Sequence, residues 1–254
     1  ADARAVIAEV CREQGAPLVE LGVDFAFEYR PPHNLQQSDS PGLFDFRWLR
    51  SPFGGEPPSP WADVAVSLPG RHQAANAAVA LAALAVPRQA GWRIDEGAAR
   101  RGLAGLRWPG RAEVVRRQPV VVLDVAHNRA SIEALLETLE ESFRARRWYL
   151  IFAASKGKDL AGMLEPLLAR FDTIALTRYG NNPRATPPEQ LAEMARTLTG
   201  RQYPVYADAS AAWSAVRAAA GPDDLICVTG SFFLAAEMRR LLTGDACDAP
   251  LSPG

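Results

Sequence analysis

An apolar run that ends in polar side chains is the chain's first candidate for chemistry. Residues 120–123 are Val-Val-Val-Leu, and Asp124, His127 and Asn128 follow before a helical pattern begins. Open α/β sheets bind ligands at the carboxyl ends of their strands. A carboxylate there can accept hydrogen bonds from ribose hydroxyls, and Asn128 is well placed to cap the next helix. The simpler alternative is that Asp124 and Asn128 only satisfy backbone groups.

A second set of polar groups lies at the start of an alanine-rich helical pattern. His72, Gln73 and Asn76 fall within Leu-Pro-Gly-Arg-His-Gln-Ala-Ala-Asn at 68–76. His72 and Asn76 are four residues apart and share a helix face. Amides of this kind can hydrogen-bond an adenine edge, and an imidazole can stack on it. The alternative is a solvated helix start with no ligand.

Three single residues complete the candidate set. Arg111 follows a Pro-Gly bend, and a restrained guanidinium suits bidentate phosphate binding. Lys156 lies in a loop after an expected strand, where it could meet a substrate carboxylate. Ser231 is a natural N-cap whose neighbouring backbone N–H groups could face an anion. A surface arginine, a solvated turn and a plain helix cap are the respective alternatives.

Two regions of different pattern must position these residues. Before Trp108 the pattern predicts a small, mostly antiparallel sheet, and after Arg111 apolar strands alternate with amphipathic helices. Such alternation predicts a mostly parallel, Rossmann-like α/β sheet flanked by helices. Trp108-Pro109-Gly110 is the expected domain boundary, giving domains at 1–108 and 109–243 and a disordered tail at 244–254. The expected strands are 18–22, 25–29, 43–49, 62–68, 120–124, 149–153, 173–177, 203–206 and 225–229, and the expected helices are 3–15, 70–84, 96–106, 129–146, 159–170, 187–198, 210–219 and 231–242.

Composition narrows the class of protein. The 254 residues carry a formal net charge of -1 and are 48% hydrophobic, which argues against nucleic acid and membranes as partners. No apolar run reaches about 18 residues, so no membrane span is expected. The three cysteines are far apart and show no zinc spacing, so we expect a reducing, cytoplasmic location. The chain starts in mid-helix without Met, which suggests a fragment of something longer, and we expect a monomer.

Four segments, taken together and in order, resemble the folylpolyglutamate synthase/dihydrofolate synthase family of ATP-dependent ligases, which is related to the Mur cell-wall ligases. They are the 68–76 segment, Trp-Pro-Gly-Arg-Ala-Glu at 108–113, Asp-Val-Ala-His-Asn at 124–128 and Val-Thr-Gly-Ser at 228–231. Two residues depart from the family pattern. Val125 replaces the commonest glycine, and Arg129 stands where the family often has proline.

The resemblance implies ligation of L-glutamate to dihydropteroate or a folate through an acyl phosphate, with ATP and Mg²⁺. It implies that His72, Gln73 and Asn76 lie at adenine, that Asp124 contacts the ribose and that Arg111 binds the phosphates. By the same resemblance His127 and Ser231 hold glutamate, Lys156 is a further carboxylate contact, and Arg111 and His127 are the catalytic residues.

The resemblance also implies that residues 1–108 are the C-terminal part of the central ATPase domain and that 109–243 are the ligase domain. The family's phosphate loop, Mg²⁺ ligands and modified lysine precede the matched part, and no Gly-x-x-x-x-Gly-Lys-Ser/Thr occurs in this sequence. We therefore expect the isolated chain to be inactive. Two alternatives stay open, a Mur-type amino-acid ligase of cell-wall synthesis and a non-catalytic nucleotide-binding module.

Overall fold

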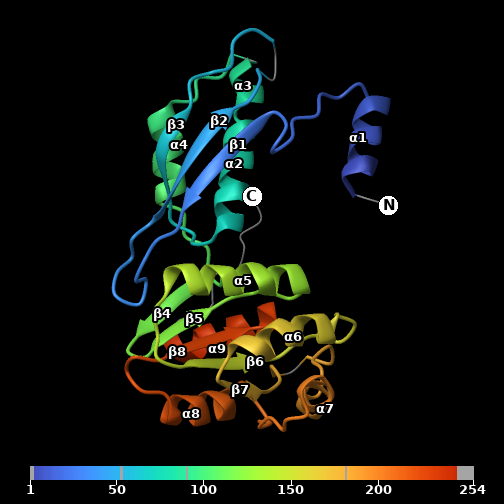
Figure 1. Ribbon diagram of the computed structural model, residues 1–254, viewed down its shortest axis with the longest axis vertical. Coiled ribbons are helices and arrows are strands. Elements are labelled where there is room, and N and C mark those ends of the chain that lie inside the picture. The colour runs from blue at the N-terminus through green and yellow to red at the C-terminus, as the bar shows by residue number, and fades with distance from the viewer. Residues whose placement is uncertain (1–2, 52–53, 90, 181, 245–254) are drawn as a thin grey trace. The chain divides into compact units, whose positions relative to one another are not determined.

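The computed structural model describes residues 3–51, 54–89, 91–180 and 182–244, which form two compact units (Figure 1). The first unit takes in the described residues up to 30, together with 41–67 and 71–106. The second takes in 31–40, 68–70 and the described residues from 107 onward. Among the described residues, the first unit has one hydrophobic core, and the second has two, one on each face of its sheet.

The first unit is a three-stranded antiparallel sheet, in the order β1-β2-β3, covered by an alanine-rich helix. Phe44 and Phe46 alternate with polar neighbours in β2 and are buried, as the period of two predicts. Small side chains such as Ala74 and Ala78 let the helix lie close against these rings. The elements are α1 (Ala3–Glu13), β1 (Phe25–Arg30), β2 (Gly42–Trp48), β3 (Trp61–Val66), α2 (Arg71–Ala83), α3 (Ala85–Gln89) and α4 (Glu96–Ala104).

The second unit is a five-stranded sheet in the order β4-β5-β8-β6-β7. β4 pairs antiparallel with β5, and the other neighbours are parallel. The predicted α/β class, with a small antiparallel sheet beside a mostly parallel one, is confirmed. The elements are β4 (Glu113–Arg117), β5 (Val120–Leu123), α5 (Arg129–Ser142), β6 (Trp148–Phe152), α6 (Leu160–Arg170), β7 (Thr173–Leu176), α7 (Pro188–Thr199), α8 (Ala209–Ala219), β8 (Leu225–Thr229) and α9 (Phe232–Thr243).

Helices cover both faces of this sheet, so its central strands are apolar on both sides. In β5, Val120 and Val122 pack into a core with α5, α6 and α7. Val121 and Leu123 pack into the opposite core with α8 and α9. Figure 1 shows this layering, with the sheet between two sets of helices. A continuous apolar run is therefore the correct signature of this strand.

Two predicted strands are wrong. Residues 18–20 have no regular structure, Leu21 makes one isolated bridge, and a turn begins at Gly22. The Asp24 carboxylate accepts the Glu20 N–H at 2.6 Å, so this N–H is not available to a strand ladder. Residues 203–206 also make one isolated bridge, from Val205 to Leu176. Pro204 has no N–H to donate, so a regular ladder cannot continue there. Three other details differ: β4 was not anticipated, the helix expected at 129–146 ends at 142, and α3 follows α2 as a separate short helix.

The structure also locates the helix caps and the cysteines. Asn128 and Ser231 each cap the helix that follows them, as predicted, and Asp95 caps α4. Cys11 and Cys227 are free thiols, and Cys247 lies outside the described residues. Of the tail predicted to be disordered at 244–254, Gly244 is the C-cap of α9 and residues 245–254 lie outside the described residues. Within the described part of the chain, no helix is both long enough and apolar enough to cross a membrane.

Candidate active site

The strand order gathers polar residues at one edge of the second unit's sheet. β5, β8 and β6 are adjacent and parallel, so their carboxyl ends lie side by side. Asp124 follows β5, Gly230 and Ser231 follow β8, and Lys156 lies in the loop after β6. This edge is where open α/β sheets bind ligands. The sequence-predicted residues of this unit therefore share one candidate site.

Asp124 is held by backbone donors at this edge. Its Oδ2 accepts the Ala112 N–H at 2.8 Å and its Oδ1 accepts the Ala126 N–H at 2.7 Å. The residue is 8% exposed, and burial raises the pKa of its carboxyl from 3.8 to about 6, against the lowering effect of the two N–H donors and of Arg111 and His127. The carboxylate thus satisfies backbone groups, and each oxygen retains lone-pair capacity for a further donor.

The Pro-Gly bend places Arg111 beside this carboxylate. Gly110 has φ +72° and donates its N–H to Glu113 Oε2 at 2.9 Å, and Glu113 Oε1 pairs with Arg239 at 3.0 Å. Ala112, the residue that donates to Asp124, has a positive φ of 44°. The bend is therefore fixed on both sides of Arg111, whose side chain is exposed. A guanidinium held in this way can bind a phosphate or carboxylate from solution.

Val125, one of the two departures from the family pattern, packs against the bend. Its N–H donates to the Gly110 carbonyl at 3.0 Å. A Cβ at Gly110 would lie 2.7 Å from Val125 Cγ1, which is too close for two carbon atoms. Glycine at 110 is therefore required both by its backbone conformation and by the valine at 125.

His127 presents one ring nitrogen outward from the start of α5. Its Nδ1 lies 3.0 Å from the Val125 carbonyl oxygen. Because a carbonyl oxygen can only accept, Nδ1 carries a proton, and in the neutral ring Nε2 is then a hydrogen-bond acceptor. The next turn is fixed by a capping box, in which Asn128 Oδ1 accepts the Ser131 N–H at 2.9 Å and Ser131 Oγ accepts the Asn128 N–H at 3.1 Å.

Arg129, the second departure, places a positive charge in the first turn of α5, which is unfavourable toward the helix dipole. Two carboxylates offset that charge. Arg129 pairs with Glu133 at 2.9 Å and with Glu165 of α6 at 2.9 Å, and these partners raise the pKa of its guanidinium. The departure is therefore accommodated by ion pairs on the helix surface.

The turn between β8 and α9 brings backbone donors to the same edge. Gly230 has φ +103° and donates its N–H to the Ala126 carbonyl at 3.1 Å, which joins this turn to the β5 loop. A Cβ there would lie 2.4 Å from the Phe152 ring and 2.5 Å from the Ala153 oxygen. Ser231 is 2% exposed, and its Oγ accepts the Phe233 N–H at 3.2 Å.

Lys156 lies in the loop that follows β6. Its Nζ donates to the Pro183 carbonyl at 2.9 Å, and its N–H donates to the Arg184 carbonyl at 2.7 Å. The ammonium has three donors, so two are still available to a carboxylate. The loop at 182–186 therefore holds this side chain at the edge of the sheet, where it is exposed.

The remaining candidates belong to the first unit. On α2, Gln73 Nε2 lies 3.0 Å from His72 Nε2, and Asn76 Nδ2 donates to Gln73 Oε1 at 3.4 Å. Because Gln73 Nε2 is a donor, His72 Nε2 accepts this bond. The three side chains thus form one hydrogen-bonded row on the first turns of the helix. Gln73 is buried and Asn76 is exposed.

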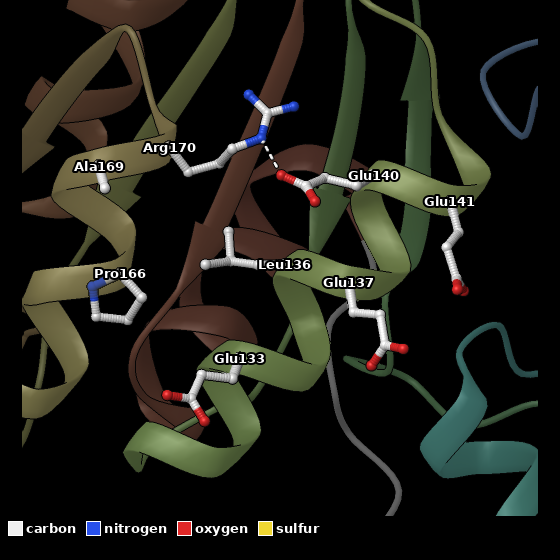
Figure 2. Close-up of a pocket in the computed structure, with 8 residues that line it drawn as sticks. All are labelled: Glu133, Leu136, Glu137, Glu140, Glu141, Pro166, Ala169 and Arg170. Atoms are coloured by element: carbon white, nitrogen blue, oxygen red, sulfur yellow. Dashed lines mark hydrogen bonds and ion pairs between the residues drawn. The ribbon is translucent and has the colours of Figure 1, made fainter.

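The hollow shown in Figure 2 lies between α5 and α6, away from all of these residues. Its volume is about 720 Å³, and Glu140 forms an ion pair with Arg170 across it at 2.6 Å. A surface rich in glutamate repels phosphates and carboxylates. This hollow is therefore a poor site for an anionic substrate. Its lining residues are Glu133, Leu136, Glu137, Glu140, Glu141, Pro166, Ala169 and Arg170.

Sequence reasoning missed several residues that shape the site. Glu113 stands in the Trp-Pro-Gly-Arg-Ala-Glu segment, three residues after the glycine it holds, so the motif itself contained a signal. Ser131 was readable as the third residue of a capping box. Tyr179 contacts Ser155 in the Lys156 loop, and Glu237 of α9 accepts the N–H of the neighbouring Gly180; no local pattern marks either residue.

The fold and the site define a class, that of the Mur-type ligases. Residues 110–232 match the family described as Mur ligase, glutamate ligase domain. Within that class, the chain is similar to folylpolyglutamate synthases and dihydrofolate synthases. The dihydrofolate synthase/folylpolyglutamate synthase of Escherichia coli is 30% identical over 236 residues, which are 93% of this chain and 49% of that protein.

Solved structures agree with this assignment. The folylpolyglutamate synthase of Mycobacterium tuberculosis complexed with ADP has a TM-score of 0.79 at 29% identity, covering 95% of this chain and 53% of that one. A bifunctional folylpolyglutamate synthase/dihydrofolate synthase with Mn, AMPPNP and L-glutamate bound has a TM-score of 0.75 at 26% identity, covering 94% and 51%. The chain spans about half the length of these proteins.

Proposed function

We propose that this chain carries the glutamate-accepting part of an ATP-dependent ligase that joins L-glutamate to dihydropteroate or to a folate. The observation that carries the proposal is the cluster of Asp124, His127, Arg111 and Ser231 at one sheet edge, inside the residues matched by the glutamate ligase domain. The relative solved with L-glutamate and AMPPNP supports the same substrates.

The proposed reaction has two steps. An acceptor carboxylate oxygen attacks the γ-phosphorus of ATP, which gives an acyl phosphate and ADP. The amino nitrogen of glutamate, after losing a proton, attacks the acyl carbon; the C–N bond forms, the C–O bond to phosphate breaks, and inorganic phosphate leaves. Arg111 would neutralise charge on the phosphoryl group.

The same proposal gives the other residues binding roles. His127 Nε2 is suited to accept a hydrogen bond from the glutamate ammonium, because Nδ1 already donates to Val125. The start of α9 at Ser231 and the ammonium of Lys156 would bind glutamate carboxylates. Asp124 would accept a ribose hydroxyl, and the row of His72, Gln73 and Asn76 would contact adenine.

The described residues do not fit a magnesium site. No group of three or more His, Cys, Asp or Glu side chains among them could hold a metal ion. We therefore propose that the ligands for Mg²⁺ lie outside residues 1–254. The sequence also has no Walker-type phosphate loop. Accordingly we propose that these 254 residues alone neither hydrolyse ATP nor ligate glutamate.

The direct test uses the gene product that contains this chain. Radiolabelled L-glutamate, ATP and Mg²⁺ are supplied with dihydropteroate, a reduced folate or a muramoyl-peptide acceptor, and the labelled product is counted. We expect incorporation with a pteroate or folate acceptor. Incorporation only with the muramoyl acceptor would favour the cell-wall ligase, and none with any acceptor would favour the non-catalytic module.

Matched variants separate the site from general damage. Arg111→Ala and His127→Ala should lower turnover about 10²-fold or more, because each removes a group facing the reacting atoms. Arg217→Ala on α8 and His33→Ala serve as controls, since both remove an exposed side chain of the same type elsewhere. Equal rates in Arg111→Ala, His127→Ala and wild type would refute the site assignment.

We also propose that the reaction takes place in the cytoplasm. The free thiols of Cys11 and Cys227 are consistent with a reducing compartment. Fractionation of cells that express the natural protein would test this location, and light scattering would test the expected monomer.

A further inference from the structure

Tyr179 connects two loops of the candidate site. It lies just after β7, is 1% exposed, and its hydroxyl shares a hydrogen bond of 2.7 Å with Ser155 Oγ. Ser155 is the residue before Lys156, in the loop that follows β6. On its other side, the Tyr179 ring stacks on Phe233 of α9, with centroids 5.2 Å apart and planes inclined by 29°.

A second contact fixes the same segment to α9. Gly180, the next residue, donates its N–H to Glu237 Oε2 at 2.8 Å. Phe233 is in the first turn of α9, where its N–H is capped by Ser231. One buried side chain therefore contacts the Lys156 loop through its hydroxyl and the Ser231 turn through its ring.

We infer that Tyr179 is a positioning residue of the glutamate site, which sets the Lys156 loop and the Ser231 turn at a fixed separation. The inference rests on the proposed function, in which these two segments bind the carboxylates of glutamate. A rigid aromatic ring between two loops holds them with few rotatable bonds, and a buried hydroxyl keeps its hydrogen bond because burial leaves it no solvent partner. Tyr179 itself does not contact the reacting atoms in this account.

The test is the variant Tyr179→Phe in the gene product that contains this chain. The substitution keeps the stacked ring and removes the bond to Ser155, so the Lys156 loop loses its bond to Tyr179 and keeps its bonds to Pro183 and Arg184, while the Ser231 turn keeps its ring contact. We expect KM for L-glutamate to rise about three- to tenfold, as loss of one buried hydrogen bond predicts. KM for ATP and kcat should stay within about twofold, because the ring contact to α9 is intact.

Tyr149→Phe is the matched control. Tyr149 is also buried, and its hydroxyl donates to the Ala219 carbonyl at 3.1 Å, but it lies near the start of β6 and not at the carboxyl edge. Tyr149→Phe also loses one buried hydrogen bond. We therefore expect it to lower stability about as much as Tyr179→Phe does, while KM for L-glutamate stays unchanged. Ser155→Ala should reproduce Tyr179→Phe, and the double variant should show no further rise, since both remove one shared bond.

The outcomes are separable. Glutamate ligation by wild type with an unchanged KM in Tyr179→Phe would overturn this inference and leave the proposed function standing. An equal rise of KM in Tyr149→Phe would overturn it as well, because the effect would then be general loosening. No ligation by wild type would overturn both.

Discussion

Among single residues, Asp124 is a buried carboxyl whose pKa is shifted by its surroundings. Its two oxygens accept N–H groups from Ala112 and Ala126, yet its pKa is raised to about 6 because burial outweighs these donors. The folded state therefore favours the protonated carboxyl. Stability contributed by this group is present below the unfolded pKa of 3.8 and is lost as pH rises to about 6.

This gives a measurable pH dependence. From pH 4 to pH 7 we expect Asp124 to reduce the free energy of unfolding by about 2 kcal/mol, which is most of the full effect that a pKa rise from 3.8 to about 6 produces. Asp124→Asn has no such titration, so the difference in stability between the variant and wild type should change by about that amount. Urea denaturation at several pH values measures it. A difference that is constant across this range would contradict the prediction.

Gly110 gives a second prediction at this scale. Gly110→Ala should destabilise by about 2–4 kcal/mol, since it combines a positive φ with a 2.7 Å approach to Val125 Cγ1. In a Val125→Gly background the close approach disappears and only the cost of the backbone conformation remains. Gly110→Ala should therefore destabilise that background by at least about 1 kcal/mol less than it destabilises wild type. A double-mutant cycle by chemical denaturation measures the coupling. Equal costs in both backgrounds would show that valine does not constrain the bend.

At the scale of elements, the turn from β8 to α9 joins three strand ends. Gly230 donates to Ala126 of the β5 loop and lies against Phe152 of β6 and Ala153, the residue that follows β6. The position of Ser231 therefore depends on a contact distance that only glycine permits. The loops that follow these adjacent parallel strands are thereby joined at one edge of the sheet.

Gly230→Ala and Gly157→Ala form a matched pair. Both glycines have positive φ, of 103° and 77°, but a Cβ at Gly157 meets nothing within 4 Å. We expect Gly157→Ala to cost about 1 kcal/mol from backbone conformation, and Gly230→Ala to cost several times more because Phe152 and the Ala153 carbonyl must move. Thermal unfolding of both variants gives the comparison. Similar losses would show that the edge adjusts easily.

At the scale of the whole molecule, the second unit includes a segment far from it in sequence. Residues 31–40 group with this unit, and Leu35 is 6% exposed in its core. The Leu35 N–H donates to the Ser142 carbonyl at 3.0 Å and so satisfies a free carbonyl at the end of α5. Arg117 donates to the Leu35 carbonyl and pairs with Asp39. The segment between β1 and β2 thus completes the core that contains α5, α6 and α7.

Leu35→Ala tests that role. We expect a loss of about 2–5 kcal/mol in the stability of the second unit, which is usual for a buried leucine. Hydrogen exchange of the β5 amides should report it. Leu49→Ala is the control, since Leu49 is 45% exposed and its loss should change stability by no more than about 0.5 kcal/mol. Unchanged β5 exchange in Leu35→Ala would place this leucine outside the core.

Local patterns predicted most of the fold for a physical reason. β5 and β6 are apolar runs because both faces are covered, and Asn128 and Ser231 cap helices through bonds within three residues. β4 was missed because an edge strand that carries Glu113, Arg116 and Arg117 lacks an apolar signature. The contacts from Tyr179 to Ser155 and from Gly110 to Val125 join loops that are distant in sequence, so only the tertiary structure reveals them.

The grouping of 31–40 with the second unit also bears on how such a protein can be recombined. An exchange of gene segments at a single junction near residue 107 would transfer the sheet of the glutamate ligase domain without Leu35. The recipient would have to supply its own apolar side chain in place of Leu35 in this core, and its own N–H donor for the Ser142 carbonyl at the end of α5. We therefore expect residues 31–40 and the chain from 107 onward to be inherited together. Hybrid proteins that receive only the part from 107 onward should fold poorly unless their own segment at 31–40 fits the transferred sheet.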